Sequence, residues 1–339
     1  MTASGPRPAR ELSVVDYHTE GEPMRIITAG VGPIPGATLL ERHEHLRTRE
    51  AALLGFVLRE PRGHAAMCGA ILTDPVTPGA HAGVLFIEPL GPVHMCGHGA
   101  MAVAAMLVES GAVPAAGPAV AVDLDTPAGL VRCRVAMDAG RAGAVTIQNV
   151  PSLSLALDRS LSVPGLGLVP FDLAWGGHVY AIVPAAAVGV PLEPAAAPRL
   201  VEVGERIRAA IEAEDALDHP ALPGGRGFLY VQFYGPAGRA DARYRNAVVV
   251  APAGIDRSPC GTGTSARMAN LHARGRLAVG EPFGHESIIG TLFTGRIARV
   301  VEVAGATAVI PEVTGRAFPC GRGTLVLDPR DPFPGGFLL

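Results

Sequence analysis

The sequence contains no lysine: all 28 basic residues among its 339 are arginine. A lysine amine forms the aldimine in pyridoxal phosphate enzymes and binds phosphate in P-loop proteins. Both chemistries therefore lack their usual central residue here, and we expect no pyridoxal phosphate and no other cofactor. The replacement of lysine by arginine is itself typical of a GC-rich coding bias.

Long apolar runs and a strong charge imbalance are also missing. The longest apolar run, Ala100–Val108, is far too short to span a bilayer, and the N-terminal segment "MTASGPRPARELSVVDYH" has no signal-peptide core. The net charge of −3 provides no basic surface for nucleic acid or an anionic membrane. We therefore expect a cytoplasmic protein that binds a small molecule, with neither nucleic acid nor membrane as a partner.

Paired cysteine motifs are absent as well. An odd number of cysteines with no CxxC pair predicts free thiols rather than disulfides or a zinc framework. His94, Cys96 and His98 in "HMCGH" are too cramped for a closed tetrahedral site, so no metal is expected. For Cys68, Cys133 and Cys320 an inert thiol is the favoured interpretation. The five cysteines are Cys68, Cys96, Cys133, Cys260 and Cys320.

The residues that are abundant indicate a strand-rich α+β protein. Hydrophobic residues make up 48% of the chain, enough for real cores, so the 43 glycines and 31 prolines are interpreted as turns rather than disorder. Short β-branched runs bounded by Gly or Pro predict strands. Examples are Gly83–Glu88, Val179–Val183 and Ile297–Val303. Helical patterns cover Leu39–Leu54, Leu200–Ala216 and the segments after Cys96 and Cys260.

Two segments share one pattern, Cys-Gly-x-Gly followed by a helix. They are "HMCGHGAMAVAAMLVESG" at His94–Gly111 and "DRSPCGTGTSARMANLHARG" at Asp256–Gly275. The first helix is apolar on all sides and therefore belongs in the middle of a domain. The segments lie roughly half the chain apart, which predicts a degenerate duplication. We expect two similar domains, 1–155 and 156–324, with the linker near Pro151–Pro170.

The stretch "GTGTSA" at Gly261–Ala266 also matches a dinucleotide-binding fingerprint, with Glu281 about 20 residues further on. However, the predicted strand before it ends near Ala251, too far away for the tight strand-to-helix turn that this motif needs. A nucleotide site is therefore the less favoured alternative.

A cysteine at a helix N-terminus is expected to be more reactive than one elsewhere. The orphan N–H groups and the helix dipole stabilise a thiolate, which predicts a thiol pKa below about 8.5. The same N–H groups bind an anion such as a carboxylate. Two such units facing each other would hold an amino acid between two thiols. One thiolate would remove the Cα proton while the opposite thiol delivers another, which inverts the centre.

The motifs "MCGHG" at Met95–Gly99 and "DRSPCGTGTSAR" at Asp256–Arg267 resemble the paired signatures of the proline racemase family. That family includes hydroxyproline 2-epimerases and trans-3-hydroxyproline dehydratases. The resemblance implies two domains of diaminopimelate-epimerase-like fold, each with strands around a central helix and with the active site in the cleft between them. It also implies that residues 325–339 cross back to the first domain.

The resemblance assigns roles position by position. Cys96 and Cys260 would be the two acid/base residues, and Asp256 would receive the ring ammonium. The N–H groups that bind the carboxylate would come from Gly97, His98, Gly261 and Thr262.

The ring substituent of the substrate is inferred from three further positions. The dehydratases resemble this chain but carry threonine where it has Cys260, which favours two-base chemistry. Cys68 and Val250 stand where proline-specific members carry bulky aromatics, and His178 stands where many epimerases carry asparagine. The small side chains leave room for a ring hydroxyl and favour 4-hydroxyproline over proline. A dehydratase, a non-catalytic amino-acid-binding protein and a homodimeric assembly stay open.

Overall fold

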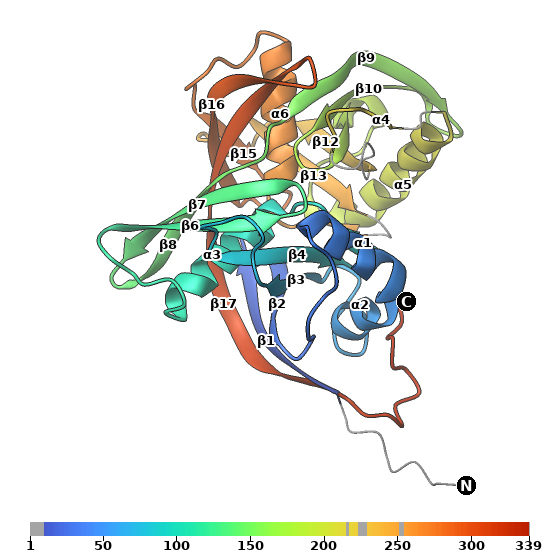
Figure 1. Cartoon of the computed structure of the whole chain (residues 1–339). Coiled ribbons are helices and arrows are strands. Elements are labelled where there is room, and N and C mark those ends of the chain that lie inside the picture. Colours follow the sequence, from blue (N-terminus) through green and yellow to red (C-terminus); the bar gives the residue numbers. More distant parts are fainter. Residues whose placement is uncertain (1–9, 215–216, 223–228, 251–253, 339) are drawn as a thin grey trace, which may run out of the picture.

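The computed structural model describes residues 10–214, 217–222, 229–250 and 254–338 (Figure 1). The end of the predicted helix at 215–216 and residues 1–9 of the first predicted domain lie outside these ranges. Helices and strands are mixed throughout, so the predicted α+β class is confirmed. No helix in the described part of the chain is long and apolar enough to cross a membrane.

The first half of the chain wraps strands around helix α3. Its elements are β1 (Arg10–Thr19), β2 (Glu22–Ala29), α1 (Leu39–Arg49), α2 (Ala51–Leu58), β3 (Cys68–Thr73), β4 (Ala82–Glu88), β5 (Gly91–Val93), α3 (Gly97–Glu109), β6 (Ala119–Thr126), β7 (Gly129–Asp138) and β8 (Arg141–Gln148).

The second half repeats this plan around helix α6. Its elements are β9 (Leu153–Val163), β10 (Gly167–Trp175), β11 (Val179–Pro184), α4 (Ala185–Val188), the 3-10 turn η1 (Pro194–Ala196), α5 (Ala197–Glu214), β12 (Leu229–Gly235), β13 (Tyr244–Val250), β14 (Gly254–Ile255), α6 (Gly261–Ala273), β15 (Phe283–Glu286), β16 (Leu292–Val303) and β17 (Ala306–Leu327).

Strand pairing confirms the duplication. In the first half β1–β2 is antiparallel, β2–β3 parallel, β4–β6 parallel and β6–β7 antiparallel. The second half repeats this series as β10–β11, β11–β12, β13–β15 and β15–β16. The two Cys-Gly-x-Gly helices, α3 and α6, occupy the same place in the two series.

Both of these helices are central. Every residue of α3 from Gly97 to Val108 is buried, and so is every residue of α6 from Gly261 to Leu271. Complete burial explains the lack of a polar face in α3. Helix α6 also buries polar side chains, and these are paired: Arg267 donates to Asn270, which donates to Asp172. The helix starts are therefore held by packing on all sides.

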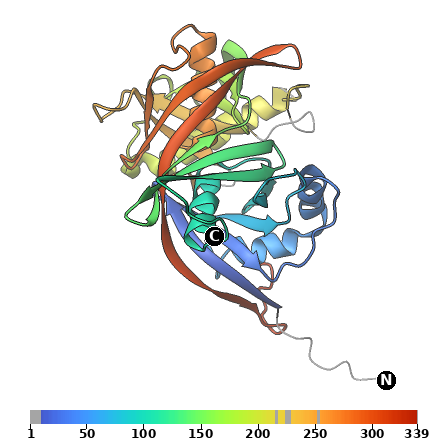
Figure 2. The ribbon, with the colours of Figure 1, turned by 60° about the vertical axis from the view of Figure 1, so that its left-hand side comes forward.

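Strand β17 joins the two halves. It pairs with β16 from Ala306, with β8 over Glu312–Arg316 and with β1 over Ala317–Leu327, and Figure 2 shows it running beside both halves. The return to the first half thus begins at Glu312, earlier than the predicted residue 325. Further along the tail, the Phe337 N–H donates to the Glu60 carbonyl at 2.9 Å.

Two local expectations need correction. The predicted helix over Leu39–Leu54 is two helices, α1 and α2, which break at Glu50. Helix α1 buries only one face, whereas α2 is buried from Leu53 to Leu58. Because the two segments are buried differently, a single straight helix would not suit both. The passage near 151–170, where we expected the linker, forms β9 and the start of β10. The exact domain boundary at 155/156 stays a prediction.

Candidate active site

Helices α3 and α6 meet at their N-termini. Cys96 is the N-cap of α3 and Cys260 is the N-cap of α6. A Cβ atom added to Gly97 would lie 2.7 Å from the Cα of Gly261, and one added to Gly261 would lie 2.8 Å from the Cα of Gly97. No real side chain tolerates such a contact with backbone. The two glycines therefore let the helix ends touch, which brings both cysteine caps to one place.

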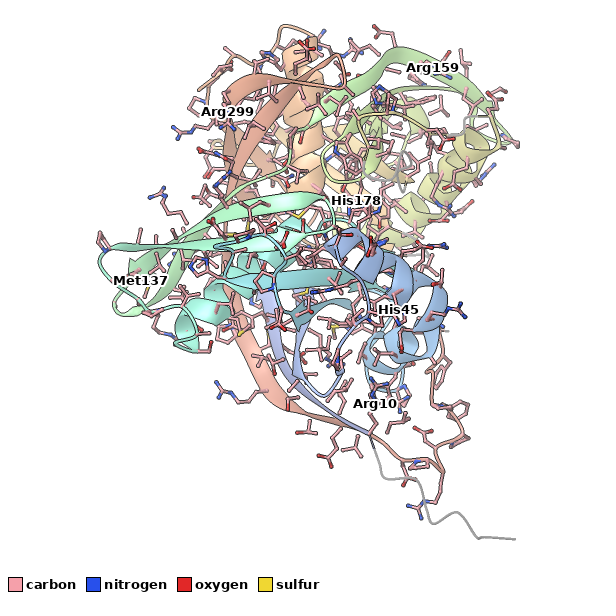
Figure 3. All side chains as sticks on the ribbon, viewed as in Figure 1. Arg10, His45, Met137, Arg159, His178 and Arg299 are labelled. Atoms are coloured by element: carbon pink, nitrogen blue, oxygen red, sulfur yellow. The ribbon has the colours of Figure 1, made fainter. Side chains whose placement is uncertain are left out.

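A small cavity of about 20 Å³ lies between the two caps. This is room for roughly one water molecule, so an amino acid enters only if the walls move apart. His178 lies at the level where the halves meet (Figure 3). The first half lines the cavity with Glu22, Cys68, Glu88, Cys96, Gly97 and His98, and the second half with His178, Tyr180, Tyr230, Asp256, Cys260, Gly261 and Thr262.

The structure thus brings together all but one of the predicted site residues. Val250 is not among the described residues that line the cavity. Instead it packs against the apolar cluster that contains Tyr180, Tyr230 and Cys260. It is the last described residue before residues 251–253, which are outside the described ranges.

Cys260 has an unusual backbone. Its φ is +62°, a left-handed conformation that is strained for a residue with a side chain. The conformation places Sγ 3.4 Å from the Gly263 N–H and 3.3 Å from the Tyr180 hydroxyl. The strained backbone at Cys260 thus places the thiol at the helix end, in the cavity lining.

Cys96 reaches a similar position without strain. Its φ is −142°, which is extended backbone. Its Sγ lies 3.3 Å from Nδ1 of His98. The first turn of α3 is anchored by the Thr19 hydroxyl, which donates to the His98 carbonyl at 2.9 Å. The two thiols therefore have different polar neighbours, a histidine for Cys96 and a tyrosine for Cys260.

The expected thiol pKa is wrong for the protein without a ligand. Burial raises the pKa of Cys96, and the carboxylate of Glu88 adds to the rise. Burial likewise raises the pKa of Cys260, with Asp256 adding to it. The N–H groups of Gly99 and Gly263 act in the predicted downward direction but are outweighed. The helix ends thus lower the thiol pKa values as expected, but burial and the nearby carboxyl groups raise them by more.

The remaining predicted contacts lie around the two caps. Asp256 is buried, and its Oδ1 accepts the Ser258 N–H at 2.8 Å. The Thr262 and Tyr180 hydroxyls are 2.6 Å apart. These bonds fix the loop before α6 and its first turn, so the N–H groups there have a defined direction.

His178 is a neutral, buried histidine. Burial lowers its pKa to about 3, and its Nε2 lies 2.5 Å from the carbonyl of Met95, so Nε2 donates that hydrogen bond. Its Nδ1 is then an acceptor, and it has no hydrogen-bond partner among the described residues. His178 therefore holds the residue before Cys96, lines the cavity and keeps one acceptor atom without a partner among the described residues.

Sequence reasoning missed four polar residues of the cavity wall. Oε2 of Glu22 accepts the Arg257 N–H at 2.6 Å, and the Tyr230 hydroxyl donates to Oε2 of Glu88 at 2.6 Å. Both bonds cross from one half to the other. The signal available in the sequence was a carboxylate at the end of the apolar run "VLFIE". The four residues are Glu22, Glu88, Tyr180 and Tyr230.

Glu88 gives a stability prediction. Burial raises the pKa of Glu88 to about 7, whereas an unfolded glutamate titrates near 4.3. Between these values the folded protein binds the extra proton, so this group's stabilisation is complete below pH ~4 and is lost as the pH rises through ~7. The unfolding free energy of the wild type should fall between pH 4 and 8. We expect this fall to be about 1–3 kcal/mol smaller in Glu88→Gln. Denaturant titrations of both proteins at several pH values measure this difference, and equal pH slopes would contradict it.

Comparison with known proteins decides the family. Residues 14–338 match the family described as proline racemase. The chain belongs to the proline racemase family. A 4-hydroxyproline 2-epimerase from Streptosporangium roseum is 50% identical over 98% of this chain and 100% of its own length. A proline racemase from Clostridioides difficile is 38% identical over 98% and 99%, respectively. Racemases and epimerases are isomerases, so this family member is an enzyme of that class.

Solved structures agree with this membership in the proline racemase family. A hydroxyproline epimerase from Agrobacterium vitis with bound trans-4-hydroxy-L-proline superimposes with a TM-score of 0.93 at 36% identity, over 97% of this chain and 95% of that one. An epimerase-like protein from Pseudomonas aeruginosa, 13% identical with a TM-score of 0.54 over 92% and 98%, shows the fold alone. The predicted two-domain epimerase fold is confirmed.

Proposed function

We propose that this proline racemase family member is a cofactor-independent 4-hydroxyproline 2-epimerase. The observation that carries the proposal is the meeting of two duplicated helix N-termini, each capped by a cysteine, at one buried cavity. This arrangement supplies one acid and one base from opposite halves of the protein. Inversion of a Cα centre needs both, one on each face.

The proposed mechanism assigns one role to each group. The substrate carboxylate accepts hydrogen bonds at the helix ends, and Asp256 accepts a hydrogen bond from the ring ammonium. The N–H groups that donate to the carboxylate are those of Gly97, His98, Gly261 and Thr262. The thiolate of one cysteine takes the Cα proton, and the electron pair is delocalised into the carboxylate that the helix ends stabilise. The thiol of the other cysteine then returns a proton to the opposite face. In the reverse direction Cys96 and Cys260 exchange roles.

A bound amino acid also brings a positive charge into the cavity. The described cavity wall carries three carboxyl groups, Glu22, Glu88 and Asp256, but no arginine. The ammonium of a bound amino acid stabilises a thiolate by Coulomb attraction, in the direction opposite to burial. Proton removal is therefore favoured only after the substrate is bound.

Polar groups of the cavity wall favour a hydroxylated substrate. His178 offers an unpartnered Nδ1 acceptor, and Glu88 with Tyr230 offers a second polar surface. The names of the S. roseum and A. vitis relatives point to the same substrate. Proline is the alternative, supported by the C. difficile relative. A dehydratase of trans-3-hydroxyproline and a non-catalytic binding protein are less favoured, because Cys260 completes a pair of bases.

Incubation in D2O tests the proposal directly. L-Proline, trans-4-hydroxy-L-proline and trans-3-hydroxy-L-proline are supplied separately, and Cα–H loss and product configuration are followed by NMR. We expect inversion of trans-4-hydroxy-L-proline with deuterium at Cα, and a much lower kcat/KM for proline. Fast inversion of proline alone would identify a proline racemase, and loss of water from the 3-hydroxy compound a dehydratase. Binding without exchange would leave only a binding protein.

The residue at position 68 is expected to influence this selectivity. Cys68 is buried beside Glu22, at the start of β3. We expect Cys68→Phe to lower kcat/KM for trans-4-hydroxy-L-proline at least tenfold while sparing proline more, because the ring fills the space of the hydroxyl. Kinetics with both substrates measure the ratio, and an unchanged ratio would refute a role for this position. Cys68→Ala, which adds no volume, is the control.

Assembly and location stay predictions. A homodimer is expected by family resemblance, and light scattering of the purified protein measures it. A cytoplasmic location is expected from the sequence alone.

A further inference from the structure

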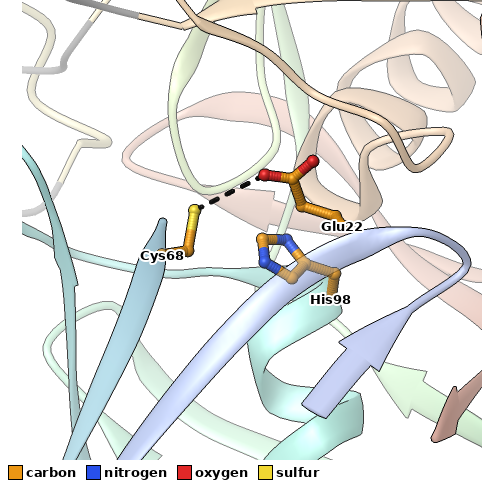
Figure 4. A group of neighbouring side chains, drawn as sticks. All are labelled: Glu22, Cys68 and His98. Carbon is orange, nitrogen blue, oxygen red and sulfur yellow. Dashed lines mark hydrogen bonds between the residues drawn. The ribbon is translucent and has the colours of Figure 1, made fainter. Parts of the chain in front are cut away.

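Three side chains of metal-ligand type converge on one side of the cavity (Figure 4). Glu22 begins β2, Cys68 begins β3 and His98 lies in the first turn of α3. A carboxylate oxygen, a thiol sulfur and a ring nitrogen from these three lie within 4.8 Å of one another. All three residues are buried. The group therefore consists of a carboxylate, a thiol and an imidazole in a site that excludes bulk water.

The separations between these ligand atoms resemble the edges of a tetrahedral zinc site. Zn–S distances of about 2.3 Å and Zn–N or Zn–O distances of about 2.0 Å place neighbouring ligand atoms roughly 3.5 Å apart. Sγ of Cys68 lies 3.9 Å from Oε1 of Glu22. Sγ of Cys96 lies 3.3 Å from Nδ1 of His98, beside this group of three but outside it. The protein therefore supplies three ligands and leaves the fourth tetrahedral position open.

We propose that Glu22, Cys68 and His98 form an inhibitory site for Zn²⁺ and similar borderline-soft divalent cations. A thiolate, an imidazole and a carboxylate form a ligand set that suits Zn²⁺ and disfavours Mg²⁺ or Ca²⁺. The surrounding charge agrees, since the described cavity wall holds carboxyl groups and no arginine. Cys68 acquires a function here that an inert buried thiol does not have.

The cation would act as a competitor of the amino acid rather than as a cofactor. On binding, Zn²⁺ displaces the thiol proton of Cys68 to solvent and forms one Zn–S bond, with no change of oxidation state. The bound cation would occupy the cavity that Cys96 also lines, so the amino acid could not bind there. The inhibition part of this inference rests on the proposed function, whereas the binding part does not.

Cobalt binding tests the site without any substrate. The full-length protein, stripped of metal and kept anaerobic, is titrated with Co²⁺, and the near-ultraviolet thiolate-to-cobalt charge-transfer band is recorded. Zn²⁺ affinity is then obtained by displacement of Co²⁺. We expect one Co²⁺ per chain with a strong thiolate band. Cys68→Ser is expected to weaken binding at least about tenfold and to remove the band, because the sulfur ligand is lost.

Matched thiols elsewhere in the chain provide the controls. Cys133 is buried in β7 and Cys320 is exposed in β17, and neither lines the cavity. Cys133→Ser and Cys320→Ser should bind Co²⁺ as the wild type does, and circular dichroism confirms that Cys68→Ser is folded. Absence of a thiolate band in the wild type, or an unchanged band and affinity in folded Cys68→Ser, would overturn the site.

Kinetics separate this inference from the proposed function. In the active epimerase, rising Zn²⁺ is expected to raise the apparent KM and leave kcat unchanged. Inhibition that lowers kcat without changing KM would contradict competition at the cavity. A protein that forms the cobalt–thiolate band but inverts none of the tested amino acids would overturn the proposed function and support the metal site.

Discussion

Replacing either cap cysteine with serine is expected to lower kcat for inversion by about 10²- to 10⁴-fold. The reason is the much higher pKa of a hydroxyl, which leaves one face of the Cα centre without an effective acid or base. Cys96→Ser and Cys260→Ser are measured separately in both directions of the reaction. Because one thiol remains in each variant, slow exchange of the Cα proton is expected to persist for the epimer that faces it.

The other free thiols supply the controls for this prediction. Cys133→Ser and Cys320→Ser change thiols that do not line the cavity. Both are expected to retain wild-type rates. Full inversion activity in Cys96→Ser or Cys260→Ser, with correct folding, would refute the assignment of the acid and the base.

Gly97→Ala is expected to have the second large effect, a loss of at least about 10²-fold in kcat/KM. The added Cβ would lie 2.7 Å from the Cα of Gly261, so the two helix ends must separate. Separation moves both thiols and both sets of N–H groups relative to one another. Steady-state kinetics measure the effect, and the melting temperature should fall as well, because the contact lies in the core.

Gly321→Ala is the matched control. Gly321 lies in the exposed part of β17, and a Cβ atom added there would have no other atom within 4 Å. This variant should keep both the melting temperature and the activity of the wild type. If Gly97→Ala behaved in the same way, close contact of the helix ends would not be required for catalysis.

The sequence predicted the centre of the site better than its wall. The repeated Cys-Gly-x-Gly pattern located both helix starts, and the apolar sequence of α3 correctly placed that helix inside a domain. These features depend on local chemistry, namely caps, glycines and hydrophobic periodicity. Each of these features is determined by residues close together in the sequence and can therefore be recognised without knowledge of the fold.

The wall depends on contacts between distant strands. Glu22 reaches Arg257, and Tyr230 reaches Glu88, across the junction of the two halves. No pattern around a single glutamate distinguishes such a partner from a solvent-exposed one. The thiol pKa was misjudged for the same reason, because desolvation depends on the complete cavity rather than on the helix end alone.

Early product labelling in D2O tests the central claim most directly. Trans-4-hydroxy-L-proline is converted to a few per cent, and deuterium at Cα is measured by mass spectrometry in the separated product and the recovered substrate. With one thiol on each face, the product gains deuterium while the recovered substrate stays almost unlabelled. Equal labelling of both would mean that one base serves both faces, and would contradict the two-cysteine mechanism.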